Sequence, residues 1–274
     1  VNIYLLDSPA GYDNSKITVE LTCPNEAMNS TFALTSLSRG KRNNVYVRTT
    51  KYYVYSSWMT EPITLNFYDN GTQVATYSTT VAQWVDNNVA NYTTSNPNVA
   101  TLMKTMLNYG AASQAYFNYK TDDLANKNND LALQQITADT IETTSDMGGT
   151  PNLSAIGATW TKCSAELKEG NALRLQVKVT NATTFDTKKT VSSSDGTTFD
   201  FVKTGSNAVA TQDNIVAADL DRVYTFTFAN HATYKQSVLG YLKTVLANNS
   251  SNQNIVNLVS SMYWYNQAAN TVFG

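Results

Sequence analysis

The sequence is short of the residues that most enzymes use for nucleophilic and metal chemistry. It has one histidine, His231, and two cysteines, Cys23 and Cys163, in 274 residues. Ser–His–Asp and Cys–His nucleophiles both need a histidine, and His231 precedes an expected helix, where a capping or surface position is its commoner role. Two cysteines 140 positions apart and one histidine disfavour a zinc site, and a lone cysteine pair disfavours a disulfide framework.

Charge is scarce too, because charged residues make up 15% of the chain against about 25% in typical soluble domains. The net charge is −2, and no basic stripe points to nucleic acid. No run of about 18 apolar residues is present, so we expect no membrane insertion. The N-terminus lacks the two regions of a signal peptide, and we interpret the chain as a mature or excised segment of a larger extracellular protein.

Enzyme motifs are missing as well: there is no G-x-S-x-G elbow, H-E-x-x-H pair, P-loop or glycine-rich dinucleotide turn. Glycoside hydrolysis needs only two carboxylates and stays open; Glu20 lies on an expected strand and Glu61 in a turn, and no pattern pairs them. The oxygen-rich stretches 122–123 and 126–130 do not have EF-hand spacing, so we interpret them as part of a solvated linker. We therefore predict no catalysis, no cofactor and no bound metal.

What the sequence does have is an internal likeness at an offset of 156 positions. Segment 105–117, TMLNYGAASQAYF, matches segment 261–273, SMYWYNQAANTVF, at positions three or four apart, which is one face of a helix. A further helical stripe precedes each segment, at 77–89 and 234–246. Asn96 and Pro97 have the residue types of a helix cap and first position. The matched pairs are Met106/Met262, Tyr109/Tyr265, Ala112/Ala268 and Phe117/Phe273.

Alternating, strand-type sequence precedes each pair of expected helices, at 16–23, 45–55 and 63–68, and again at 173–179, 198–202 and 223–228. Asp69-Asn70-Gly71 predicts a hairpin turn. The predicted fold class is therefore α+β, a tandem pseudo-repeat in which each lobe is a small antiparallel β-sandwich followed by a two-helix hairpin. The expected boundaries are a first lobe at 1–120, a linker at 121–152 and a second lobe at 153–274.

Aromatic residues suggest what the chain binds, because flat rings stack on the C–H faces of sugars while amides and hydroxyls meet sugar hydroxyls. The chain has 17 tyrosines and 4 tryptophans, although aromatics also fill cores. The pairs Tyr109/Tyr265 and Trp84/Tyr241 fall on the shared apolar stripe and are expected to be structural. Trp264 stands where the other copy has polar Asn108, which suggests exposure and makes it the first ligand candidate.

Five further ligand candidates have less specific support. Trp58 lies near a turn, and Trp160 at the start of a strand could equally anchor a sheet. Aromatics at 52, 53 and 55 fall on both faces of one expected strand, so at least one faces away from the core, although an ordinary sheet face accounts for them too. The candidates are Trp58, Trp160, Tyr52, Tyr53 and Tyr263.

The segment from Met106 to Asn126, with its LNYGAASQAYFNYKTDDLAN stretch, resembles a recurrent sequence in large secreted proteins of gut bacteria. The whole chain is similar to the second starch-binding domain type of the amylosome starch adherence-system proteins of ruminococci. That resemblance implies an extracellular or cell-surface module that binds starch and maltooligosaccharides, as α-1,4-glucan helices, in a groove between or along two lobes. It implies no catalysis, and other proteins of the complex would be contacted through domains outside this chain.

Two alternatives stay open beside starch binding. A structural or protein-interaction module of a cell-surface complex, with no glycan ligand, needs only the internal likeness. A glycoside hydrolase with unrecognised carboxylates needs only two acidic side chains that the fold brings together.

Overall fold

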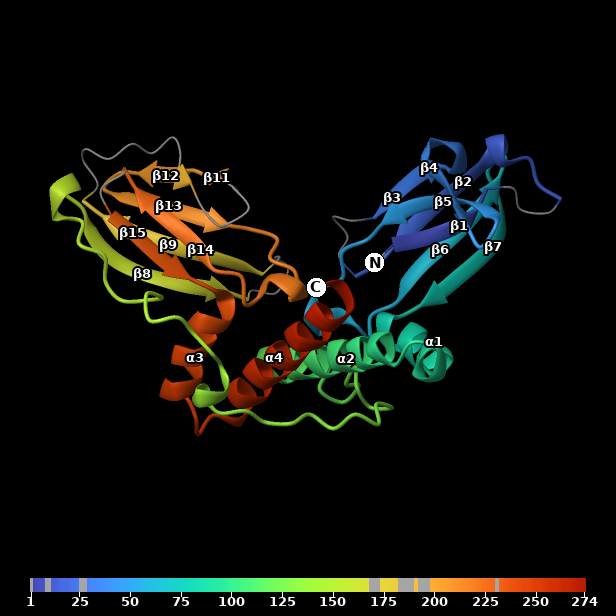
Figure 1. Ribbon diagram of the computed structural model, residues 1–274. Helices are drawn as coiled ribbons and strands as arrows, with labels where there is room; N and C mark the ends of the chain where they lie inside the picture. Colours follow the sequence, from blue (N-terminus) through green and yellow to red (C-terminus); the bar gives the residue numbers. More distant parts are fainter. Residues whose placement is uncertain are drawn as a thin grey trace.

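The computed structural model describes residues 2–7, 11–24, 29–167, 173–181, 190–191, 198–229 and 232–274. Two β regions lie at opposite ends of the molecule, and the helices α1 to α4 lie between and beneath them (Figure 1). The first β region contains strands β1 to β7, and the second contains strands β8 to β15. His231 lies outside the described residues.

The first β region is built from two antiparallel sheets. One has the strand order β1-β5-β4 and the other β3-β2-β6-β7. Ile17, Val19 and Leu21 of β2 alternate with less buried neighbours, so one face of the second sheet forms the core of this region. The strands are β1 (Asn2–Leu6), β2 (Ile17–Thr22), β3 (Ser30–Ala33), β4 (Ser38–Arg42), β5 (Val45–Lys51), β6 (Ile63–Asp69) and β7 (Thr72–Thr79).

The second β region has a four-stranded sheet in the order β12-β13-β9-β8 and two separate two-stranded sheets, β14-β15 and β10-β11. Its core packs fully buried Val177 of β9 with Phe226 and Phe228 of β14. The strands are β8 (Thr159–Glu166), β9 (Arg174–Thr180), β10 (Thr190–Val191), β11 (Thr198–Phe199), β12 (Phe201–Thr204), β13 (Asn207–Gln212), β14 (Tyr224–Phe228) and β15 (Ala232–Gln236).

Each long helix begins at a side-chain cap of the kind that polar residues supply best. Thr80, Asn96, Ser237 and Asn252 each accept a hydrogen bond from a backbone N–H in the first turn of the helix that follows. The cap at Asn96 and the first helical position of Pro97 are as predicted. The helices are α1 (Val81–Ser95), α2 (Pro97–Phe117), α3 (Val238–Asn248) and α4 (Gln253–Phe273).

Short 3-10 turns connect several of these elements, and two of the turns pack against a helix. The turn η4 (Ser56–Trp58) packs on α2, and η7 (Ala217–Asp219) packs on α4. The remaining turns are η1 (Asn14–Lys16), η3 (Leu34–Ser36), η5 (Ala138–Thr140) and η6 (Ser154–Ile156).

The predicted fold class is right in being mixed α+β and wrong in being a tandem repeat of sandwich and helical hairpin. The two β regions differ in their sheets, since only the first has a three-stranded partner sheet among the described residues. The closest helix pair is α2 with α4, one from each half, while α3 has 11 residues and touches α4 little. The matched positions Tyr109 and Tyr265 therefore meet each other across this contact instead of each serving a separate hairpin.

Several element boundaries also differ from the prediction. The strand expected at 45–55 ends at Lys51, which leaves the aromatics at 52, 53 and 55 in a connecting segment. The helices expected to begin at Tyr77 and Tyr234 begin only at Val81 and Val238. Both tyrosines lie on strands, because β7 continues to Thr79 and β15 to Gln236, directly before the helix caps Thr80 and Ser237. The hairpin at Asp69–Gly71 is confirmed, with positive φ at both central residues, Asn70 and Gly71.

The segment 121–152, expected to be a solvated linker, is held against the helices over part of its length. Ala125 and Ile141 are buried, and Ala125 N–H donates to the side chain of Gln114 at 2.8 Å. Ile136 N–H donates to Ser260 Oγ of α4 at 3.0 Å. A segment without periodicity is tied down here by side-chain hydrogen bonds that composition does not reveal.

Candidate ligand-binding site

The aromatic candidates from the sequence do not come together at one place. Trp58 lies in η4 and packs edge-on against Tyr55, with ring centroids 4.9 Å apart, and is stacked on Tyr119 at 6.2 Å. The Tyr119 hydroxyl donates to Glu61 Oε1 at 2.5 Å, and the Lys120 ammonium lies 2.5 Å from the same oxygen. Trp58 thus belongs to a cluster that fastens the end of α2 to the start of β6.

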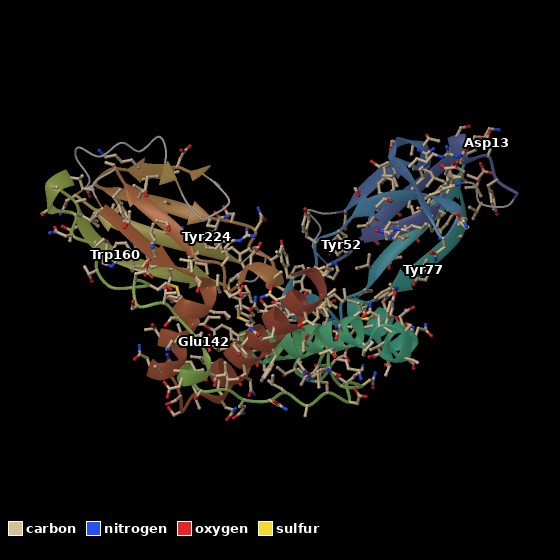
Figure 2. All side chains as sticks on the ribbon, viewed as in Figure 1. Asp13, Tyr52, Tyr77, Glu142, Trp160 and Tyr224 are labelled. Carbon is tan, nitrogen blue, oxygen red and sulfur yellow. The ribbon has the colours of Figure 1, made fainter. Side chains whose placement is uncertain are left out.

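Trp160 and Tyr52 have packing roles. Trp160 contacts Tyr234 at 4.5 Å between ring centroids and Phe228 at 6.2 Å, so it lies on the core of the second β region, as its alternative interpretation expected (Figure 2). Tyr52 is buried at the inner side of the first β region. Tyr53, its neighbour, is strongly exposed but lines none of the four grooves described below.

Trp264 is half-buried, and its indole N–H donates to the carbonyl of Gln134 at 2.9 Å. Its ring packs edge-on against Tyr263 at 5.1 Å. The argument that Trp264 is exposed because Asn108 is polar fails, since Asn108 is buried and its amide donates to the carbonyl of Leu131 at 2.9 Å. Both side chains hold the segment 121–152 onto the helices.

Trp264 does line a groove of about 300 Å³ between α2, α4 and residues 131–134. Its polar lining is largely occupied, because the Asn108 oxygen accepts hydrogen bonds from Asn126 and Asn129. The hydroxyls of Thr101 and Thr105 donate to backbone carbonyls of α2. This groove therefore offers a ligand one partly exposed ring and few free hydrogen-bonding groups.

A second groove, in the first β region, is lined by three exposed tyrosines, and we call it the tyrosine groove. Tyr4, Tyr12 and Tyr77 each leave between 42 and 53% of their surface exposed. The groove has a volume of about 420 Å³. Its other lining residues are apolar: Ile3, Leu5, Leu6, Ile17, Leu34, Leu65, Phe67, Val74 and Ala75.

The tyrosine groove exists because the two sheets of this region end in edge strands that do not pair with each other. Tyr4 lies on the edge strand β1. Tyr77, which is labelled in Figure 2, lies on the edge strand β7. A β-bulge between the pairs Phe67–Ala75 and Tyr68–Gln73 lets Val74 line the groove together with Tyr77. Within the described part of the chain, no hydrogen bond occupies the hydroxyls of Tyr12 or Tyr77, so both can meet a ligand.

Two further grooves are less suited to stacking. One, of about 490 Å³, lies between α3, α4 and β8 and has Tyr116 and Tyr241 in its lining. The other, of about 860 Å³, lies beside α4 and β14 and has no aromatic lining. Four of its five charged groups form the ion pairs Arg222–Asp219 and Lys235–Asp146, and the fifth, Asp221, accepts hydrogen bonds from Asn266 and Asn270.

The carboxylates that left hydrolysis open are engaged in structural contacts. Asn66 and Tyr68 donate hydrogen bonds to Glu20 at 3.0 and 2.9 Å, which hold the pKa of this carboxyl below its ordinary value. Glu61 is buried and paired with Lys120. Among the residues that the structure describes, no three histidine, cysteine or acidic side chains gather as a metal site would require. No helix in the described part of the chain combines the length and apolar character needed to cross a bilayer.

The tyrosines of the groove were missed by sequence reasoning for identifiable reasons. Tyr77 was assigned to a helix stripe, and Tyr4 and Tyr12 lie outside the matched segments. No local sequence signal marks them, because the edge position of β7, whose residues are nearly all exposed although three of them are apolar, follows only from the fold. Trp84, expected to be structural, is exposed on α1.

No protein-family model, curated protein or solved structure matches this chain. The similarity to starch-binding domains of the amylosome proteins therefore stays a prediction.

Proposed function

We propose that this protein is a non-catalytic carbohydrate-binding module, and that it binds starch chains through the tyrosine groove. The observation that carries the proposal is the convergence of three exposed rings, Tyr4, Tyr12 and Tyr77, on one groove. Single exposed aromatics are common on protein surfaces, but three around one apolar depression form a patch of the kind that marks binding sites.

The lining of the groove suits a glucan better than a small polar metabolite. The apolar lining matches the C–H faces of glucose units, and the tyrosine hydroxyls at the rim supply donors and acceptors for sugar hydroxyls. One stacking contact is worth about 1 kcal/mol beyond area burial, by analogy with aromatic pairs. Two or three such contacts on one linked chain act at high effective concentration, so micromolar to millimolar affinity for long chains is expected.

The rest of the proposal follows from composition and resemblance. Few charged residues and many amides and hydroxyls suit an extracellular protein that contacts a neutral polymer. The choice of α-1,4-glucan over other glycans rests on the similarity to the amylosome starch-binding domains. Partners beyond starch and maltooligosaccharides would be reached through domains outside this chain.

The experiment is native gel retardation by amylopectin, with isothermal titration of maltoheptaose for affinity. Tyr77→Ala and Tyr12→Ala should each weaken binding by about fivefold to tenfold, which corresponds to about 1.0–1.4 kcal/mol. Both should leave thermal unfolding nearly unchanged, because each ring is about half exposed.

Tyr116→Ala is the matched control, since Tyr116 is 44% exposed and lies in the groove of the opposite half. Normal binding by Tyr77→Ala and Tyr12→Ala together with weak binding by Tyr116→Ala would move the site to that groove. If the intact protein shows unchanged mobility with amylopectin, amylose and maltoheptaose, the glycan proposal fails and the protein-interaction alternative replaces it.

A further inference from the structure

The first β region carries a concentration of positive charge that the acidic chain lacks elsewhere. Residues 38–48, covering β4 and most of β5, contain four cationic side chains and no acidic one. The net charge is −2, so the rest of the chain carries −6. Strand β4 is exposed along its whole length at the edge of its sheet, next to β5 (Figure 1). We call Arg39, Lys41 and Arg42 the basic strand.

The cations of the basic strand are held in place by aromatic rings and one buried carboxylate. The Arg39 guanidinium lies 3.9 Å above the Tyr46 ring, and the Lys41 ammonium lies 5.1 Å from the same ring. Arg39 Nε also donates to the buried Asp7 carboxylate at 2.7 Å, which Arg48 shares. Because ring and carboxylate fix these side chains beforehand, an anion that binds them orders fewer rotamers.

The basic strand adjoins the tyrosine groove through Arg42. Its guanidinium donates to the Tyr4 hydroxyl at 2.6 Å and lies 4.7 Å from the centre of the Tyr4 ring. Tyr4 itself lines the groove. Within the described residues, no carboxylate lies within 4 Å of Lys41 or Arg42, so none of these residues neutralises their charge by an ion pair. By the strand register, Arg39 and Lys41 lie on the Tyr46 face of the sheet and Arg42 lies on the Tyr4 face, so the cations flank the exposed edge from both faces. A glucan that leaves the groove past Tyr4 meets Arg42 first, with Lys41 next to it at the edge.

We propose that the basic strand recognises phosphate monoesters on the glucan that the tyrosine groove binds. This inference rests on the proposed function and specifies its ligand as a phosphate-bearing α-glucan. A phosphate monoester carries close to two negative charges at neutral pH and several acceptor oxygens, which suit the N–H donors of two arginines and a lysine. The neutral part of the chain is held by the rings, and the phosphate adds an electrostatic contribution.

Nucleic-acid binding and protection of a sheet edge account for the basic strand less well. A nucleic acid carries a phosphate at every nucleotide and would extend beyond residues 38–48, where it would meet residues that carry −6 in total, whereas a single phosphate monoester meets the basic strand alone. Charged side chains also keep edge strands from pairing with other molecules. That role does not require the cations to be fixed on Tyr46 and Tyr4, as they are here.

The test compares amylopectin that carries phosphate monoesters with the same polymer after phosphatase treatment, using affinity gels and titration. The phosphorylated form should bind about threefold to tenfold more tightly at low salt, and the difference should vanish at about 0.5 M salt, where exposed charges are screened. Lys41→Gln should reduce the preference by about threefold without changing binding of the dephosphorylated polymer. Lys203→Gln, which removes an exposed lysine of the second β region, should leave both unchanged.

Equal affinity for the two polymers would overturn the inference and leave the proposed function standing. Equal loss of both affinities in Lys41→Gln would also overturn it. Binding of a DNA oligonucleotide as tight as that of the phosphorylated polymer would show a general polyanion surface instead. If neither polymer binds, the proposed function fails and the inference fails with it.

Discussion

Tyr109 of α2 and Tyr265 of α4, 156 positions apart, stack on each other with ring centroids 5.8 Å apart and an interplanar angle of 28°. The two residues occupy matched positions in the sequence, and the contact lies in the closest helix pair of the molecule. Burial raises the pKa of both phenols, that of Tyr265 to about 12. The stack therefore belongs to the interface that joins the two halves.

Replacement of Tyr109 by alanine should cost about 3 kcal/mol of unfolding free energy, from the lost core packing of a partly buried ring and the lost aromatic pair. Denaturant unfolding measures the change directly. Tyr116→Ala, an exposed position on the same helix, should cost less than about 1 kcal/mol. A Tyr109→Ala variant as stable as Tyr116→Ala would show that the stack contributes little.

Separation of the two halves should leave neither able to fold alone. Cutting the chain near residue 145 removes α4 from α2 and exposes the apolar faces that meet there. Circular dichroism of fragments 1–145 and 146–274 should show largely unfolded chains apart, with helix signal and co-elution recovered on mixing. Two independently folded fragments would contradict the view of α2–α4 as a shared core.

The sequence predicts where the long helices lie and which face of each is apolar, but it does not predict which elements those faces pack against. Asn96, Pro97 and the stripe containing Tyr109 predict helix starts and one apolar face, because capping and 3.6-residue periodicity are local properties. Whether that face meets its own sheet or the other helix depends on contacts more than 100 positions apart, which periodicity does not encode. The repeat prediction failed at this step.

The candidate ligand residues were also misassigned because local sequence does not show long-range contacts. Because Asn108 is polar, the matched Trp264 was expected to be exposed. Instead, both side chains donate a hydrogen bond of 2.9 Å to a backbone carbonyl of residues 131–134. A buried amide that donates to a loop looks like a surface residue in the sequence alone. Tyr77 is recognisable as a groove residue only once β7 is known to be an edge strand with a bulge.

Stability should fall in alkaline solution because of buried acidic protons. Burial raises the pKa of the Cys163 thiol to about 12, against a partly offsetting hydrogen bond with Tyr234, and burial raises that of Tyr265 to about 12. Unfolded cysteine and tyrosine ionise near pH 8.5 and 10, so the contribution of these groups is fully present below about pH 8. It is lost progressively as pH rises toward about 12.

Denaturation midpoints measured between about pH 7 and 11 should therefore decline, and Cys163→Ala should flatten the part of the decline that begins near pH 8.5. The Cys163 thiol should also react slowly with thiol reagents at about pH 8, where it stays protonated. A midpoint that is constant to about pH 11, or rapid modification of Cys163 in the folded protein, would be inconsistent with this burial.

Trp264→Ala should destabilise the protein by about 2–4 kcal/mol, as for a truncated core aromatic, because Trp264 is half-buried and anchors Gln134. The change leaves the Gln134 carbonyl without its indole donor and frees residues 131–136, whose hydrogen exchange should accelerate. Trp264→Phe keeps the ring packing against Tyr263 but not the N–H, so it should recover most of the stability and little of the exchange protection. Melting and hydrogen exchange of both variants separate these contributions.

An early-melting Trp264→Ala variant that still binds amylopectin would show that Trp264 has a structural role. A variant that melts normally and binds about tenfold more weakly would instead return it to the ligand site, as its place in the groove beside α4 allows.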